Sequence, residues 1–386
     1  MTAHARLSAS SAERWLNCTG SPALNEGKVS HTSVWAQEGT DAHKMGEEIL
    51  RGASVIPTTP EGDEMLEAVS VYTTYCLKLM DEADEYHIEK QITLNNLYWD
   101  SKPPEPLFGT ADFVAKIDKV LHVVDYKHGA GVVVEVANNA QLAYYALGAF
   151  FAMTNGNPKS IDEVEITIIQ PRAPHPLGPV RTWYIGVADL MLWGKKFKNT
   201  IDKIANGETL LNTGTWCRFC PSQGDCPEAY REAVESARLD FKAAPSDGPE
   251  TLTDEALVEV LNGMHFAESW LKAVATGAQG RLERGNTLDG WKLVAKRAIR
   301  KWKDEPSTVL WVEASLSQNE RPLAFSNKIL SPAQMEKILK KLGKSLPVNL
   351  IEKKSSGVTL ASEADPREAT PAGPLVDFDN LPDQSH

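Results

Sequence analysis

The sequence predicts an α/β protein with a central mixed β-sheet flanked by helices, followed by a smaller C-terminal α+β region. Helical patterns come first along the chain, then a β-hairpin, a helix and further strands. This order favours one sheet that is covered by helices. Residues 164–170 are apolar or β-branched at nearly every position, which is typical of a strand buried on both faces.

Local signals justify the individual elements. Asn138 or Asn139 can cap a helix, and Ser331 with the proline after it is a helix start. Asp118 and the lysine after it separate two apolar runs as the turn of a hairpin. The expected helices span residues 8–24, 33–51, 62–83, 138–153, 187–206, 253–284 and 331–343. The expected strands span residues 86–94, 108–117, 120–127, 164–170 and 180–186.

Composition divides the chain into four parts. Residues 1–239 hold the α/β pattern and a cysteine cluster. Residues 240–252 are rich in Pro, Ser and Gly and are expected to form a linker. Residues 253–355 are expected to form an accessory domain that contacts DNA. Residues 356–386 are acidic and rich in Pro and Ala, which predicts a disordered tail.

Charge and hydropathy exclude some functional classes. The chain has 386 residues, a net charge of −12 and 42% hydrophobic residues, which fits a globular protein. It contains no run of 18 apolar residues, so we expect no membrane span. Its first residues lack the apolar core of a secretory signal, which predicts a cytoplasmic location.

The net negative charge argues against a broadly basic nucleic-acid-binding surface. A local basic patch is still possible on the sequence, because six Lys and Arg side chains fall within residues 292–303, beside Trp291 and Trp302. Cations and aromatic rings together can bind phosphates and stack on unpaired bases. The alternative is an ordinary solvated face of a strand or helix.

The hairpin carries the most informative side chains. Alternation along each strand places Asp112, Asp125 and Lys127 on one face near one end. Two carboxylates about 4 Å apart repel by roughly 4 kcal/mol at an effective dielectric of about 20. Mg²⁺ or Mn²⁺ would offset that repulsion, generate hydroxide from water and stabilise charge on a phosphate. The alternative is a turn at Asp112 and a solvated strand end at Asp125–Lys127.

Five cysteines occur, and three of them form the spacing C-x₂-C-x₅-C at Cys217, Cys220 and Cys226. In a cytoplasmic protein such a cluster indicates a metal more than a disulfide framework. Three thiolates leave a tetrahedral site incomplete, so a fourth ligand must come from elsewhere. Cys76 lies in an apolar helical segment and is expected to be a buried small residue.

Three segments resemble the core motifs of the RecB-like branch of the PD-(D/E)xK nuclease superfamily. They are Gly109–Asp112, Val123–Lys127 and Gln141–Ala146, and Glu38–His43 resembles an upstream helical motif of that branch. The resemblance covers about residues 8–230. It implies a restriction-endonuclease-like nuclease core.

The resemblance also implies roles for individual residues. Asp112 and Asp125 would bind Mg²⁺ or Mn²⁺, His43 would complete the coordination, and Tyr126 would offer its backbone carbonyl. Lys127 would be the catalytic lysine.

On the next helix, Gln141 and Tyr145 would support the site and contact DNA. Without the resemblance, His43 would be interpreted as a surface or packing residue. Gln141 and Tyr145 would be interpreted as the polar edge of an amphipathic helix. Glu89 is expected to be structural.

The same branch includes members with one cysteine before the nuclease core and three after it. Cys18 and the later triad match that layout, which implies a [4Fe–4S] cluster that joins the two ends of the domain, with zinc as the alternative metal. Closing a loop of about 200 residues could contribute roughly 5 kcal/mol, by analogy with a disulfide.

Together these features predict a metal-dependent deoxyribonuclease, expected to be a phage-encoded exonuclease that serves recombination, replication or repair. DNA would be its substrate, and a single-strand annealing protein, recombinase or helicase its protein partner. A second hypothesis is a non-catalytic DNA-binding recombination protein that retains the fold. A third is a metal-stapled scaffold that binds another protein and has no affinity for DNA.

Overall fold

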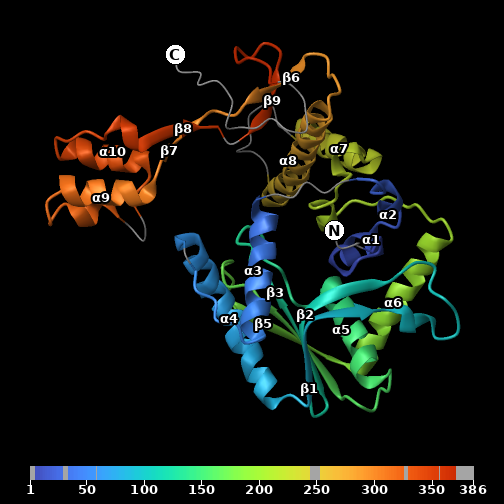
Figure 1. Cartoon of the computed structure of the whole chain (residues 1–386). Coiled ribbons are helices and arrows are strands. Elements are labelled where there is room, and N and C mark those ends of the chain that lie inside the picture. The colour runs from blue at the N-terminus through green and yellow to red at the C-terminus, as the bar shows by residue number, and fades with distance from the viewer. Residues whose placement is uncertain are drawn as a thin grey trace. The chain divides into compact units, whose positions relative to one another are not determined.

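The structure is a computed structural model of the chain (Figure 1). It describes residues 5–28, 34–57, 59–243, 253–325, 329–355 and 357–370. The chain divides into two compact units, Met1–Ala267 and Glu268–His386, which are considered separately.

The first unit contains a five-stranded sheet and most of the helices. Its strands are β1 (Glu85–Thr93), β2 (Phe108–Ile117), β3 (Val120–Tyr126), β4 (Glu163–Ile169) and β5 (Val180–Gly186). Its helices are α1 (Ala12–Asn17), α2 (Ser21–Leu24), α3 (Val34–Leu50), α4 (Pro60–Glu82), α5 (Ala140–Thr154), α6 (Val187–Ala205) and α7 (Pro227–Ala243). The long helix α8 (Asp254–Glu283) contains the boundary between the units.

The sheet has the order β1-β2-β3-β4-β5. β3 and β4 run parallel, and the other neighbouring pairs are antiparallel. Helices α5 and α6 cover one face, and α3 and α4 cover the other (Figure 1). The predicted mixed sheet flanked by helices is therefore confirmed.

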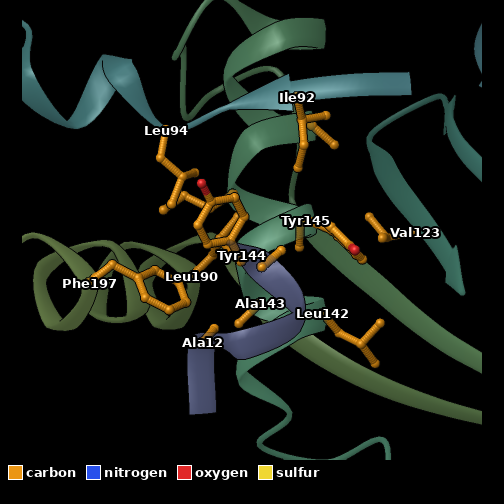
Figure 2. Packing of buried hydrophobic residues seen from close by; sticks show 14 of the residues in the cluster. Ala12, Ile92, Leu94, Val123, Leu142, Ala143, Tyr144, Tyr145, Leu190 and Phe197 are labelled. Atoms are coloured by element: carbon orange, nitrogen blue, oxygen red, sulfur yellow. The ribbon is translucent and has the colours of Figure 1, made fainter. Parts of the chain in front are cut away.

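The larger core lies between the sheet and the α5–α6 layer. Helix α5 is apolar around nearly its whole circumference, as a helix enclosed by protein must be. Figure 2 shows Tyr144 of α5 beside Phe197 of α6, and their ring centroids are 5.7 Å apart. Gly148 allows α5 to approach β1 closely, because a Cβ there would lie 2.7 Å from Ile92 Cδ1. This packing fixes the N-terminal end of α5 against the sheet.

The helix predicted at residues 8–24 is broken. The segment forms a 3₁₀ turn at Ala9–Ser11, then α1 and α2, with Cys18 in a non-helical conformation between the two helices. Pro22 stands in the first turn of α2 and could not continue a helix from residue 18. A tertiary contact holds the break: Gly20 donates to the Leu210 carbonyl, and a Cβ at Gly20 would lie 2.6 Å from the Thr209 carbonyl oxygen. Helix α7 follows the cysteine cluster and was not expected.

The described part of the second unit holds the end of α8, two small sheets and helices α9 and α10. Strands β6 (Trp291–Ala295) and β9 (Val358–Ser362) form one sheet, and β7 (Ile299–Trp302) and β8 (Ile351–Lys354) form the other. Helices α9 (Glu305–Ser315) and α10 (Pro332–Lys341) pack together, and Ser331 caps α10 with a capping box.

The structured region extends past the boundary predicted at residue 355. β9 pairs with β6, and Ala369 bridges to Val294, because the backbone groups of β6 are satisfied from this segment. Residues 371–386 of the expected tail and 244–252 of the expected linker lie outside the described residues.

The basic run at 292–303 is split between two sheets, which separates its charges. Lys292 donates to the Asp365 carbonyl, and Arg300 forms an ion pair with Glu336 of α10 at 2.6 Å. The predicted patch therefore has fewer free cations than the sequence suggests. In the part of the chain that the structure describes, no helix has the length and hydropathy that a membrane span requires.

Candidate metal centre

The two aspartates of the hairpin stand where the pairing of β2 with β3 stops. The ladder ends at the pair Phe113–Val124, and Asp112 and Asp125 are the next residues beyond it. Both are buried, with 8% and 2% of their surfaces exposed, respectively. The Tyr126 N–H donates to Asp112 Oδ2 at 2.8 Å, which turns this carboxylate towards β3.

Helix α3 and strand β1 add two further ligand types. His43 Nδ1 of α3 lies 3.4 Å from Asp112 Oδ1. Glu89 of β1 faces Asp112 across the sheet, between the pairs Ile88–Phe113 and Lys90–Ala111. Among the described residues, His43, Glu89 and Asp112 offer ligand atoms that all lie within 4.8 Å of one another.

Glu89 is the site residue that sequence reasoning missed, because it was expected to be structural. Its φ is +50°, in the left-handed region that side chains other than glycine rarely adopt. Such strain is held in place by surrounding structure and gathers at functional sites. An acid within a strand gives no distinctive signal by itself; the signal appears only when the register opposite Asp112 is known.

The lysine of the hairpin is held between a carboxylate and an amide. Lys127 Nζ lies 2.8 Å from Asp125 Oδ2 and donates to Gln141 Oε1 at 3.3 Å. Gln141 Nε2 in turn donates to the Tyr145 hydroxyl at 3.1 Å, one helical turn further along α5. Asn139 caps α5 by accepting from the Leu142 N–H, which fixes the turn that presents Gln141.

The charges in this site perturb one another. Burial alone would raise the pKa of Asp112, but His43 and Lys127 outweigh it and hold that pKa below its usual range. Burial raises the pKa of Asp125, and the charge of Asp112 adds to the effect. Burial would lower the pKa of His43, yet Asp112 raises it to about 9. Burial and Asp112 raise the pKa of Glu89 to about 7.

The donor set fits a hard divalent cation. It combines carboxylate oxygens, which suit Mg²⁺ and Mn²⁺, with one imidazole nitrogen, a donor that transition metals bind more readily than Mg²⁺ does. Asp125 Oδ2 is buried, and its close partner is Lys127 Nζ at 2.8 Å. Tyr126 is buried between His43 and Tyr72. The role of its carbonyl as a ligand stays a prediction.

The cysteines of the predicted staple lie on two segments that pack together. Ser222 N–H donates to Asn25 Oδ1 at 3.0 Å, and Lys28 pairs with Asp225 at 2.5 Å. Arg14 Nη1 donates to the Phe219 carbonyl at 3.1 Å. These contacts join the region around Cys18 to the region that carries the triad.

The four thiols influence one another electrostatically. Burial raises the pKa of Cys217 to about 11, and Cys220, Cys18 and Cys226 all act in the same direction. No three cysteine sulfurs of the described residues lie within 4.8 Å of one another, so no set at the spacing of a single ion is formed. Cys76 is fully buried in α4, as expected.

Fold and site define an α/β protein with a buried cluster of carboxylates, histidine and lysine that suits a divalent cation. The chain belongs to a family described as "Protein of unknown function (DUF2800)", whose model matches residues 4–368. Among solved structures it is similar to one described as "Crystal structure of SSO0001", with 14% identity over 49% of this chain and 96% of that chain. The TM-score of that match is 0.23.

Proposed function

We propose that this protein is a metal-dependent deoxyribonuclease of the RecB-like PD-(D/E)xK type. The observation that carries the proposal is the set of ligand atoms from His43, Glu89 and Asp112 within 4.8 Å of one another, beside the ion pair of Asp125 with Lys127. A fold does not by itself specify an activity, so the proposal depends on this geometry and its charges.

His43, Asp112 and Asp125 would hold Mg²⁺ or Mn²⁺, with Glu89 and the Tyr126 carbonyl as further ligands. The bound ion would supply an activated water and stabilise negative charge on the phosphate.

Lys127 would position the attacking water and hold a proton at Nζ. Burial would lower the pKa of Lys127, but Asp125 and Asp112 raise it, so the side chain is a cation at neutral pH. Gln141 holds the ammonium group in place, and Tyr145 orients Gln141. Both side chains lie at the end of α5 where a DNA strand would approach the metal.

DNA would be the substrate, and an exonuclease of recombination, replication or repair is the form that the resemblance favours. The same proposal includes a phage origin and a cytoplasmic location. It also includes action beside a single-strand annealing protein, recombinase or helicase. The competing hypothesis of a non-catalytic DNA-binding protein is disfavoured by the intact Asp112, Asp125 and Lys127. A scaffold that binds only protein does not require this buried cluster of charged side chains, so the third hypothesis does not account for it.

The cysteines would hold a structural metal, because phosphodiester hydrolysis needs no redox step. A single zinc ion would hold its sulfurs about 3.8 Å apart, from a Zn–S length of about 2.3 Å and tetrahedral angles. No three thiols of the described residues lie within 4.8 Å of one another. The resemblance favours a [4Fe–4S] cluster held by Cys18, Cys217, Cys220 and Cys226, with zinc as the alternative.

Cleavage of DNA tests the proposed activity. Linear duplex and single-stranded DNA are incubated with Mg²⁺ or Mn²⁺ and either the wild-type protein or Lys127→Ala. We expect wild-type cleavage and a loss of at least about 100-fold in Lys127→Ala, because a fixed charge at the reacting phosphate is removed. Lys119→Ala is the matched control, since Lys119 lies in the exposed turn of the same hairpin. Equal, negligible cleavage by all three proteins would favour the DNA-binding alternative.

A further inference from the structure

A second group of side chains lies beside the metal centre, at the start of α3. Arg172, in the segment after β4, donates through Nη1 to Glu38 Oε1 at 2.6 Å and contacts His128 Nε2 at 2.5 Å. His128 is 4% exposed, and its Nδ1 lies 2.8 Å from the Tyr126 hydroxyl. Arg172 is thus tied, through His128, to a residue of the metal centre.

The hydrogen-bond partners determine the tautomer of His128. A guanidinium group only donates, so His128 Nε2 must accept from Arg172 and the ring proton lies on Nδ1. Nδ1 therefore donates to the Tyr126 hydroxyl. A buried neutral imidazole and a carboxylate together fix the Nη1 end of Arg172 in one position.

The other end of Arg172 remains available. Within the described residues, every hydrogen bond of this side chain uses Nη1, and Nε and Nη2 donate to no protein group. Its side chain keeps 31% of its surface exposed. The free Nε–Nη2 edge is the planar fork that binds two phosphate oxygens at once.

An exposed tryptophan stands one helical turn before Glu38. Trp35 lies on the same stripe of α3 as Ala42 and Gly46, which are packed inside the protein, yet Trp35 is 76% exposed. Residues three apart on a helix are neighbours, so position 35 adjoins that of Glu38, the partner of Arg172. His43 comes eight residues later, about 12 Å along the helix axis.

We propose that Trp35 and Arg172 form a subsite for one unpaired nucleotide next to the scissile phosphate. The base would stack on the Trp35 indole, and a neighbouring phosphate would bind the Nε–Nη2 edge of Arg172. This inference rests on the proposed nuclease function and extends it to a substrate class, single-stranded DNA. A base inside a duplex is already stacked on its neighbours and gains nothing from Trp35.

Binding of a fluorescein-labelled oligothymidylate, followed by anisotropy with Mg²⁺ in a Lys127→Ala background, tests the subsite without cleavage. Stacking is worth about 1–3 kcal/mol per base, which corresponds to about fivefold to 150-fold weaker binding for Trp35→Ala. Trp35→Phe should retain most of the affinity. Trp99→Ala is the matched control, because Trp99 is 87% exposed and stands in a segment distant from α3 in sequence.

Two further measurements separate this subsite from a general loss of fold. A blunt duplex should bind Trp35→Ala and its Lys127→Ala parent equally within about twofold. Arg172→Gln should lower the slope of log K against log salt on the oligothymidylate by about 0.7, because one phosphate contact is lost. Trp35→Ala should leave that slope unchanged.

Any one of three outcomes would overturn the inference: equal oligothymidylate binding by Trp35→Ala and Trp99→Ala, an equal loss on the duplex, or an unchanged salt slope in Arg172→Gln. Hydrolysis of thymidine 5′-(p-nitrophenyl phosphate), measured in protein with Lys127 intact, tests the nuclease proposal separately. This small ester reports the hydrolytic chemistry. If no protein with Lys127 intact hydrolyses the ester, the nuclease proposal is refuted. The oligothymidylate binding data would still show whether Trp35 and Arg172 form the subsite.

Discussion

Metal binding at this centre should release protons, because two of its ligands carry protons when no ion is bound. The pKa of His43 is raised to about 9 and that of Glu89 to about 7. A metal binds the neutral imidazole and the ionised carboxylate. Raising the pH removes both protons, so affinity must rise with pH.

The size of the effect follows from these values. At pH 7 about 1% of His43 is neutral and about half of Glu89 is ionised, given pKa values of about 9 and about 7. The affinity for Mn²⁺ at pH 7 should therefore be about 100-fold below its high-pH limit through His43 alone. Between pH 7 and 9 it should rise by nearly tenfold per pH unit.

Isothermal titration calorimetry in two buffers with different ionisation enthalpies counts the released protons. We expect about 1.5 protons per Mn²⁺ at pH 7, one from His43 and half from Glu89. Glu89→Gln should reduce the number to about one, and His43→Ala should leave between about half a proton and one, because the His43 charge lowers the pKa of Glu89. A titration with no proton release, or an affinity that does not change between pH 6 and 8, would refute the assignment of these two ligands.

Three other predictions follow from single residues. Glu89→Gly should stabilise the metal-free protein by about 1 kcal/mol, since it relieves a φ of +50°, and it should weaken Mn²⁺ binding. Asp118→Gly, at a φ of +51°, should stabilise the protein without changing its affinity for Mn²⁺. Chemical denaturation measures the stability of both variants, and calorimetry measures their Mn²⁺ affinity. Gly148→Ala should cost about 1 kcal/mol of unfolding free energy, because the new Cβ would lie 2.7 Å from Ile92 Cδ1 and overpacking outweighs helix propensity; an unchanged or higher melting temperature would contradict this packing. Cys18→Ser should remove the brown colour of anaerobically purified protein and cost about 2–5 kcal/mol, by analogy with a lost disulfide; a colourless wild type with stoichiometric zinc would exclude iron.

Much of the first unit could be predicted because its signals are local. The hairpin expected at 108–117 and 120–127 matches β2 and β3 within one residue, since a two-residue turn separates two apolar runs. The cap at Asn139 predicts the start of α5, and hence the placing of Gln141 and Tyr145 on one face. Spacing alone then brings Asp112, Asp125 and Lys127 to one end of the hairpin.

The remainder depended on contacts between distant segments. Glu89 enters the site through its register with Asp112, which no local pattern encodes. The break at Cys18 reflects the approach of Gly20 to Thr209. Gly20 and Pro22 are also local helix-breaking signals, which the prediction of one helix over 8–24 did not use. The basic run appeared continuous because its members are neighbours in sequence, although β6 and β7 pair with different strands.

A crystal of the protein grown with Mn²⁺, and measured at the manganese absorption edge, tests the central claim most directly. The account predicts one anomalous peak within about 2.5 Å of oxygens from both Asp112 and Asp125 and of a ring nitrogen of His43. It also predicts that the peak disappears in Asp125→Asn. A map with no peak between these side chains, or with manganese bound only elsewhere, would contradict the metal centre and the hydrolysis built on it.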